Sequence, residues 1–387
     1  MSKVFLRPQI AAQITRQLLQ PGALDEAFRS GLFISGLRRT GKTTFLKNDL
    51  IPSLEQAGAL VIYIDLWSDP QTNPAKLVHS AIQETLHKLE SPASSLIQRL
   101  KEIRGADIGV MAFKFGFKLE SVGSSEGPTL AQALKAVVDQ FKVDVVLIID
   151  EVQHAMTTED GNNLLFALKA ARDAINQRPQ PPGHFLFIGT GSHRALVNEL
   201  TARRTQAFAG AVSVPYPVLG EDYVEYLLKR LKDEGIQTLP SLVVATAAFG
   251  TLGNRPEEFI RALKQLAISL PTGGEADQYF PVIAATIRSM AAEVELSKVE
   301  EMGGLAMAIF EKVASAEGDA RGLFTVSAVA AYSNTIGREV KVDEVQPVAN
   351  QLLDANIIMR RGHGHYCVAD PFVQAVWKER QRLLSHE

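Results

Sequence analysis

Gly36-Leu37-Arg38-Arg39-Thr40-Gly41-Lys42-Thr43 has the spacing G-x-x-x-x-G-K-T, and an apolar run, Leu32 to Ser35, precedes it. Glycines at these positions let backbone N–H groups turn inward around phosphate oxygens, and the start of a following helix adds positive potential. Apolar residues recur at helical spacing after Lys42, which predicts such a helix. The candidate nucleotide-binding residues are Gly36, Leu37, Arg38, Arg39, Thr40, Gly41, Lys42, Thr43 and Thr44.

A second stretch, Val145 to Ile149, is wholly apolar and is followed by Asp150 and Glu151. Open α/β sheets bind their ligands at the carboxyl ends of such strands. Lys42 is the candidate contact of the β- and γ-phosphates, and Thr43 and Asp150 are the candidate Mg²⁺ ligands. Glu151 is the candidate that orients the attacking water. The motifs together predict hydrolysis of a bound nucleotide; the alternative is a pair of solvated carboxylates that only end a strand.

Apolar runs separated by helical patterns extend over the first half of the chain. Strands are expected at Leu32 to Ser35, Leu60 to Leu66, Val143 to Ile149 and Phe185 to Gly189. Continuous apolar runs are typical of strands that are covered on both faces. The alternation indicates an α/β fold, a parallel sheet sandwiched by helices. The period-two pattern from Ile108 to Glu120 predicts an inserted strand or hairpin with one face in water.

Beyond Pro217 the pattern becomes helical, and the Gly-containing stretch Pro271 to Gln278 is the candidate linker. A helix-turn-helix from Thr325 to Ala355 and a strand-turn-strand from Ile357 to Val368 are expected near the end. We therefore predict a P-loop core at residues 1–218, a helical lid at 219–270 and a winged-helix-like C-terminal domain at 279–387.

The composition is typical of a soluble globular protein. Of the 387 residues 46% are hydrophobic, and the formal charge of -3 gives no global attraction to nucleic acid or to anionic membranes. The single cysteine, Cys367, excludes an intramolecular disulfide framework and fits a reducing compartment. No signal peptide and no run long enough to span a bilayer is seen. These features predict a cytoplasmic protein that does not enter a membrane.

The two motifs and the tail Gln153-His154 resemble those of AAA-type ATPases, in the group of archaeal-type, signal-transduction (STAND) and DNA-transposition ATPases. The resemblance covers about Phe5 to Phe259. It implies ATP and Mg²⁺ as ligands and ATP-dependent assembly into a homo-oligomer. No Asn-Lys-x-Asp motif for reading guanine occurs, which favours ATP over GTP. Gln153 and His154 either report the nucleotide state or only pack their loop.

The resemblance also implies sensing and arginine-finger positions. Thr190 or Ser192 lies where a polar side chain senses the γ-phosphate, although a hydroxyl departs from the usual asparagine; the alternative is a turn that caps the next helix. Arg203 or Arg204 matches an arginine finger that acts on another subunit, or else forms a solvated pair of helix charges. Arg255 matches a second sensor of the γ-phosphate at the start of a lid helix, or only marks a helix start.

The end of the chain, Leu352 to Tyr366, resembles the last helix and the wing of a winged helix. Its expected tip carries Arg360, Arg361, His363 and His365. Such a cluster fits DNA phosphates, whereas protein packing or autoinhibition is the alternative. Alternation of two of these histidines with Cys367 suggests metal ligands only superficially, since a fourth ligand is missing.

Three functions are compatible with these residues. The first is a nucleotide-dependent switch that acts on DNA or on a protein partner in defence, transposition or signalling. The second is an ATP-stabilised adaptor that recruits an effector and hydrolyses ATP only incidentally. The third, a small-molecule phosphotransferase, is ranked lowest because Glu151 beside Asp150 suits activation of water.

Overall fold

The computed structural model describes residues 4–69, 71–90, 94, 96–98, 102, 129–271, 274–362 and 364–384. The chain divides into two compact units. Residues Met1–Gly36 and Lys42–Tyr216 form the first unit, and Leu37–Gly41 and Pro217–Glu387 form the second. Each unit has its own hydrophobic core. The strand or hairpin predicted at Ile108 to Glu120 lies outside the described residues.

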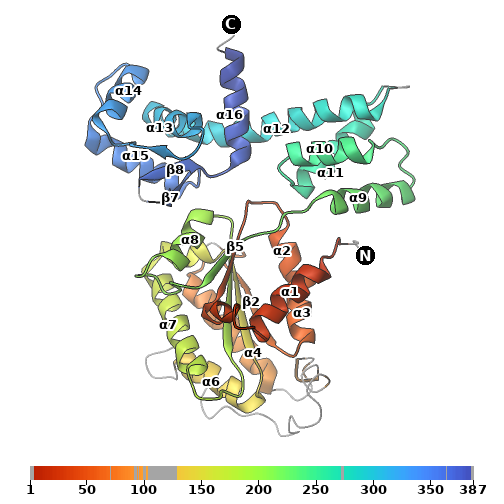
Figure 1. The fold of residues 1–387 in the computed structure, drawn as a ribbon, viewed down its shortest axis with the longest axis vertical. Helices are drawn as coiled ribbons and strands as arrows, with labels where there is room; N and C mark the ends of the chain where they lie inside the picture. Colours follow the sequence, from red (N-terminus) through yellow and green to blue (C-terminus); the bar gives the residue numbers. More distant parts are fainter. Residues whose placement is uncertain are drawn as a thin grey trace. The chain divides into compact units, whose positions relative to one another are not determined.

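The first unit is built on a five-stranded parallel sheet (Figure 1), which confirms the predicted fold class. Its strands run in the order β2 (Leu60–Asp65), β3 (Val145–Asp150), β4 (Phe185–Gly191), β1 (Leu32–Ser35) and β5 (Val212–Pro215). The register pairs Asp65 with Asp150 and Ser35 with Gly191. The strands therefore end together at one edge, which we call the carboxyl edge, and begin together at the amino edge.

Helices cover both faces of this sheet (Figure 1). One face is packed by α1 (Pro8–Leu19), α2 (Lys42–Phe45) and α3 (Ile51–Gln56), and the other by α4 (Pro74–Glu90), α6 (Leu130–Phe141), α7 (Glu159–Asn176) and α8 (Arg194–Ala202). Along β3, Val146 and Ile148 pack on the first group, and Val145, Leu147 and Ile149 pack on the second. This double burial explains why β3 is apolar throughout.

Strand β2 differs from the prediction that both of its faces are covered. Val61 and Tyr63 are only partly buried, whereas Ile62 and Ile64 are buried. The reason is that β2 lies at the end of the sheet order, so that one face has fewer neighbours. The partly open face is the one from which Tyr63 reaches the functional site described below.

The helix after the phosphate-binding loop is not uniform. A π-helical segment, Leu46–Leu50, joins α2 to α3, and the backbone N–H of Ile51 donates to Leu46 O. Pro52 follows directly and has no N–H to donate. Pro52 therefore interrupts the α-helical bonding pattern, and the wider π-helical turn directly before it accommodates this interruption.

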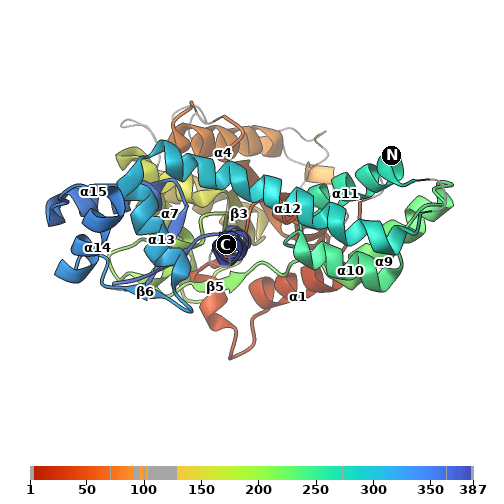
Figure 2. The ribbon, with the colours of Figure 1, turned by 90° about the horizontal axis from the view of Figure 1, so that it is seen from above.

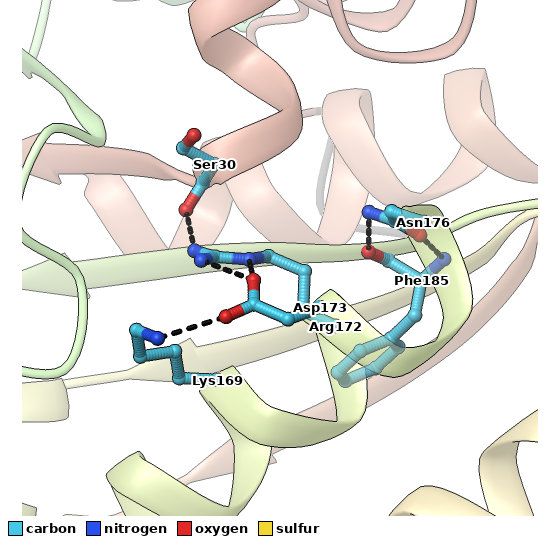
Figure 3. A network of polar contacts seen from close by, with 6 residues as sticks. All are labelled: Ser30, Lys169, Arg172, Asp173, Asn176 and Phe185. Carbon is cyan, nitrogen blue, oxygen red and sulfur yellow. Dashed lines mark hydrogen bonds and ion pairs between the residues drawn. The ribbon is translucent and has the colours of Figure 1, made fainter. Parts of the chain in front are cut away.

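The amino edge of the sheet is held by polar side chains of α7 (Figure 3). Arg172 donates to Ser30 O at 2.5 Å and to Asp173 Oδ1 at 2.7 and 2.9 Å. Lys169 donates to the other oxygen of Asp173 at 2.8 Å. Asn176 exchanges two hydrogen bonds with the backbone of Phe185, where β4 begins. These contacts join α7 to the starts of β1 and β4.

The second unit begins with α9 (Glu221–Asp233), α10 (Leu242–Thr251) and α11 (Pro256–Ser269). A long helix, α12 (Ala276–Glu301), packs on α10 and α11 and continues to α13 and α16 (Figure 2). The predicted linker at Pro271 to Gln278 therefore ends inside a helix. The predicted lid and C-terminal domain fall within one compact unit.

The C-terminal part is winged-helix-like. It contains α13 (Gly304–Ser315), α14 (Val326–Ile336), α15 (Val342–Asp354) and α16 (Pro371–Leu384), with a three-stranded antiparallel sheet in the order β6 (Ala320–Arg321), β8 (His365–Val368), β7 (Ile358–Gly362). In the described part of the chain, no helix is long and apolar enough to cross a bilayer.

Candidate functional site

The phosphate-binding loop connects β1 to α2. Gly36 packs so closely that an added Cβ would lie 2.8 Å from Tyr216 Cβ, and Gly41 has a φ of +91°. Both positions therefore require glycine. Lys42 is buried, and its ammonium donates to Gly36 O at 2.9 Å. The ammonium therefore bonds back to the first residue of the loop. A bound phosphate oxygen would replace the Gly36 carbonyl as its hydrogen-bond partner.

The other loop residues differ in exposure. Thr40 is buried and donates to Leu37 O at 2.8 Å, which closes the loop, whereas Arg38 and Thr44 are exposed. Arg39 has a φ of +63° and forms an ion pair with Glu258 at 3.2 Å, and both residues belong to the second unit. Arg39 is therefore engaged by the start of α11.

Oxygen atoms gather around Asp150 at the carboxyl edge. Thr43 Oγ1 donates to Asp150 Oδ2 at 2.7 Å, Tyr63 donates to the same oxygen at 3.2 Å, and Thr190 donates to Oδ1. Burial and the adjacent Asp150 carboxylate raise the pKa of Tyr63, so that its hydroxyl stays protonated. Hard oxygen donors of a hydroxyl and a carboxylate are ligands that Mg²⁺ prefers. The pair Thr43 and Asp150 fits the predicted metal site.

Glu151 follows with a left-handed backbone, φ +56°. Its Oε2 accepts hydrogen bonds from Gln153 Nε2 at 2.5 Å, Ser192 Oγ at 2.7 Å and Ser192 N at 3.0 Å. Burial alone would raise the pKa of Glu151, but these hydrogen bonds and the charge of Lys42 lower it. Glu151 is thus held as a carboxylate beside Asp150.

The structure brings both candidate sensor hydroxyls into this cluster. Thr190 contacts Asp150, and Ser192 contacts Glu151. The capping alternative also holds in part, because His193 caps α8 by accepting from Leu196 N at 3.4 Å. Sensing of a γ-phosphate stays a prediction for both hydroxyls.

The candidate arginine fingers lie elsewhere. Helix α8 runs from the carboxyl edge, where β4 ends, toward the amino edge, where β5 begins. Arg203 follows its last residue and pairs with Glu199 at 2.6 Å, and Arg204 is exposed. Neither arginine is brought to the phosphate-binding loop of its own chain.

Arg255 belongs to the second unit, at the N-cap of α11. Its guanidinium donates to Asp370 Oδ2 and lies 4.6 Å from the ring centre of Phe372. Asp370 Oδ1 in turn accepts from Phe372 N at 3.1 Å, in the first turn of α16. The predicted sensor arginine is therefore bound to the winged-helix-like part.

Tyr63 was not recognised in the sequence as a site residue. Its signal is weak because a tyrosine within an apolar strand is ordinary. Only the pairing of β2 with β3 places its hydroxyl next to Asp150. Gln153 stood directly after the motif, but only the contact with Glu151 gives it a role.

The parallel sheet, the loop and the Lys42, Thr43 and Asp150 cluster define a P-loop nucleotide-binding protein. Residues 29–197, which contain both sequence motifs, match the model of the AAA domain family, so this part of the chain is an AAA-type P-loop domain. This confirms the resemblance seen in the two sequence motifs.

Solved structures with similar folds include two archaeal proteins. A Walker-type ATPase of Pyrococcus abyssi has 16% identity over 97% of this chain and 96% of its own, with a TM-score of 0.58. The ORC2 protein of Aeropyrum pernix in its ADP form has 13% identity over 99% and 95%, with a TM-score of 0.56. No curated protein matches the sequence. At these identities the similarity concerns the fold.

Proposed function

We propose that the chain binds Mg²⁺-ATP, hydrolyses it to ADP and phosphate, and acts as a nucleotide-dependent switch on a partner in defence, transposition or signalling. The cluster of Lys42, Thr43, Asp150 and Glu151 at one edge of the sheet is the observation that carries the catalytic part. The similarly folded ORC2 protein has been solved in an ADP form, which supports an adenine nucleotide as the ligand.

Each side chain has a task in this reaction. Loop N–H groups and Lys42 bind the β- and γ-phosphates, and Lys42 neutralises the charge that develops in the transition state. Thr43 and Asp150 hold Mg²⁺, which neutralises and orients the phosphate oxygens when bound. Glu151 positions and polarises the attacking water. Its lowered pKa suits an orienting carboxylate better than a strong proton acceptor.

The Arg255–Asp370 pair is the observation that carries the switch. Arg255, the proposed sensor of the γ-phosphate, cannot fully serve Asp370 and a phosphate at once, since its side chain is only 11% exposed and already engaged. Asp370 also caps α16. If Arg255 bound a nucleotide instead, Asp370 would lose this partner and the winged-helix-like part would be held less firmly. A local change in charge would then cause a larger conformational change.

A protein partner is favoured over DNA. The second helix of the helix-turn-helix, α15, carries Asp343, Glu344 and Asp354 and has no Lys or Arg from Val342 to Asp354. DNA phosphates require cationic side chains. At the wing, Arg360 donates to Tyr366 and lies over its ring, and His365 lies 3.6 Å from Asp319. The side chains of Arg361 and His363 lie outside the described residues.

Assembly is the remaining part of the proposal. Arg203 and Arg204, at the end of α8 away from their own loop, suit a finger presented to a second copy of the chain. An arginine of one copy would then complete the ATP site of the next copy, so that bound ATP would promote a homo-oligomer.

Sizing the protein with and without ATP and duplex DNA tests this function, with Lys42→Ala as the control. We expect ATP-dependent assembly and phosphate release in the wild type and neither in the variant. If assembly and phosphate release are both independent of Lys42, the proposal is wrong. Assembly that survives in Glu151→Gln and suffices for partner binding would support the adaptor instead.

The variant Asp370→Asn tests the proposed switch, because asparagine keeps an oxygen for capping α16 but loses the charge that holds Arg255. ATP affinity, measured by calorimetry, should rise ~5-fold or more, in the range of ordinary coupling between sites. Affinity for ADP should stay the same, since ADP lacks the γ-phosphate. An unchanged ATP affinity in Asp370→Asn would contradict the coupling.

A further inference from the structure

We propose that Gln153 is a positioning residue for hydrolysis: it holds one oxygen of Glu151 so that the other stays available to the attacking water. This inference rests on the proposed ATPase function and adds a residue to it.

The three hydrogen bonds to Glu151 all reach the same oxygen. Gln153 Nε2, Ser192 Oγ and Ser192 N converge on Oε2, at 2.5 to 3.0 Å. No described residue donates a hydrogen bond to Oε1. A carboxylate fixed through one oxygen has a fixed plane, so the lone pairs of the second oxygen point in one direction. This is the arrangement that an orienting carboxylate needs.

The local backbone delivers Gln153 to this place. Glu151 is left-handed, φ +56°, and the 3-10 helix Val152–Thr157 starts directly after it. A left-handed glutamate is strained, and such strain persists where the surroundings hold it. The tight helical turn then brings the side chain of Gln153 back alongside the carboxylate two positions earlier.

Gly191 makes room for the glutamine. A Cβ at position 191 would collide with Gln153 Oε1. The amide must turn its NH₂ group toward Glu151, because a carboxylate only accepts. Its carbonyl therefore faces Gly191, buried and without a hydrogen-bond partner among the described residues. A buried unpaired carbonyl is unfavourable. Its persistence indicates that the contact with Glu151 determines how Gln153 is placed.

The test separates positioning from packing. Gln153→Met keeps the length of the side chain and removes the donor. We expect kcat for phosphate release to fall ~10- to 100-fold, as for other residues that orient a catalytic group. Affinity for ATP and ADP and the melting temperature should stay close to wild type. Gln153→Asn should restore little, because its shorter side chain does not reach Glu151.

A double-mutant cycle with Glu151→Gln completes the experiment. If Gln153 acts through Glu151, then Gln153→Met should lower kcat no further in the Glu151→Gln background. Equal losses in both backgrounds, or losses of nucleotide affinity and stability as large as the loss of kcat, would overturn the inference. So would a wild-type rate in Gln153→Met. A wild-type chain that releases no phosphate while its Lys42→Ala control behaves identically would overturn the proposed function and this inference with it.

Discussion

Both edges of the five-stranded sheet contain carboxylates and cationic side chains, but these groups make different contacts at the two edges. At the amino edge, Arg172, Asp173 and Lys169 satisfy one another and the backbone of Ser30 (Figure 3). At the carboxyl edge, Asp150 and Glu151 accept hydrogen bonds from uncharged groups such as Thr43 and Ser192, and Lys42 donates to Gly36 O.

The difference shows how one sheet separates stability from function. A network in which charges are matched rigidifies the core and has no capacity left for a ligand. The carboxylates of Asp150 and Glu151 can bind a cation, and the backbone N–H groups of the phosphate-binding loop can bind an anion. Variants at the two edges should therefore affect different measurements, and the predictions below run from the largest expected effect to the smallest.

Lys42→Ala should have the largest effect, at the carboxyl edge. ATP affinity should fall at least ~100-fold, because the lysine supplies a fixed cation for the β- and γ-phosphates. The melting temperature without nucleotide should change little. Calorimetric titration with ATP measures the first effect. Lys88→Ala, at an exposed pair with Glu84, is the matched control and should change neither quantity; strong ATP binding by Lys42→Ala would contradict the assigned site.

Glu151→Gln should lower phosphate release ~100-fold and leave ATP binding intact, since the amide keeps the shape but no longer polarises water as a carboxylate does. Single-turnover kinetics with radiolabelled ATP measures this. Asp173→Asn makes the same chemical change at the amino edge. It should lower the melting temperature and leave the rate unchanged, so a loss of rate there would erase the distinction between the edges.

Arg172→Ala should destabilise the first unit by ~3 kcal/mol, because it removes both hydrogen bonds to Asp173 Oδ1 and leaves Ser30 O without its donor. The side chain of Arg172 is only 11% exposed. Nucleotide affinity should not change under conditions in which the variant is fully folded. Denaturant unfolding followed by circular dichroism measures the loss, and a difference below ~1 kcal/mol would show that the network contributes little.

The same variant should change the response to acid. Burial alone would raise the pKa of Asp173, but hydrogen bonds from Lys169 and Arg172 lower it. A carboxyl whose folded pKa is lowered stabilises the protein above its ordinary pKa, and this contribution is lost as the pH falls through the folded pKa. Between neutral pH and that window, the wild type should therefore lose more stability than Arg172→Ala.

Thr129→Ala should have the smallest effect, ~1 kcal/mol. Thr129 and Gln132 form a reciprocal capping box at the start of α6, with bonds of 3.2 and 2.8 Å. Thr129→Ser keeps the hydroxyl and should restore the stability measured in urea. Both variants should hydrolyse ATP at the wild-type rate, because α6 contributes no residue to the carboxyl edge.

Much of the first unit could be predicted because its signals are local. The apolar runs of β1, β3 and β4 and the G-x-x-x-x-G-K-T spacing depend only on neighbours in the chain. The strand β5 was missed because its four residues, half of them exposed, form a short edge strand. The continuous helix α12 was read in part as a linker, because Pro271 and two glycines precede its first turn.

The amino-acid sequence by itself determined the class of fold, the phosphate-binding loop and the two carboxylates that follow β3. These features follow from spacing along one segment of chain, where glycine freedom and apolar periodicity act over a few residues. Only the tertiary structure decided which oxygen of Glu151 is held, that Tyr63 contacts Asp150, and that Arg255 is bound by Asp370. Those contacts join residues from separate strands and helices, and hydrogen bonds form only where packing brings a donor within reach of an acceptor.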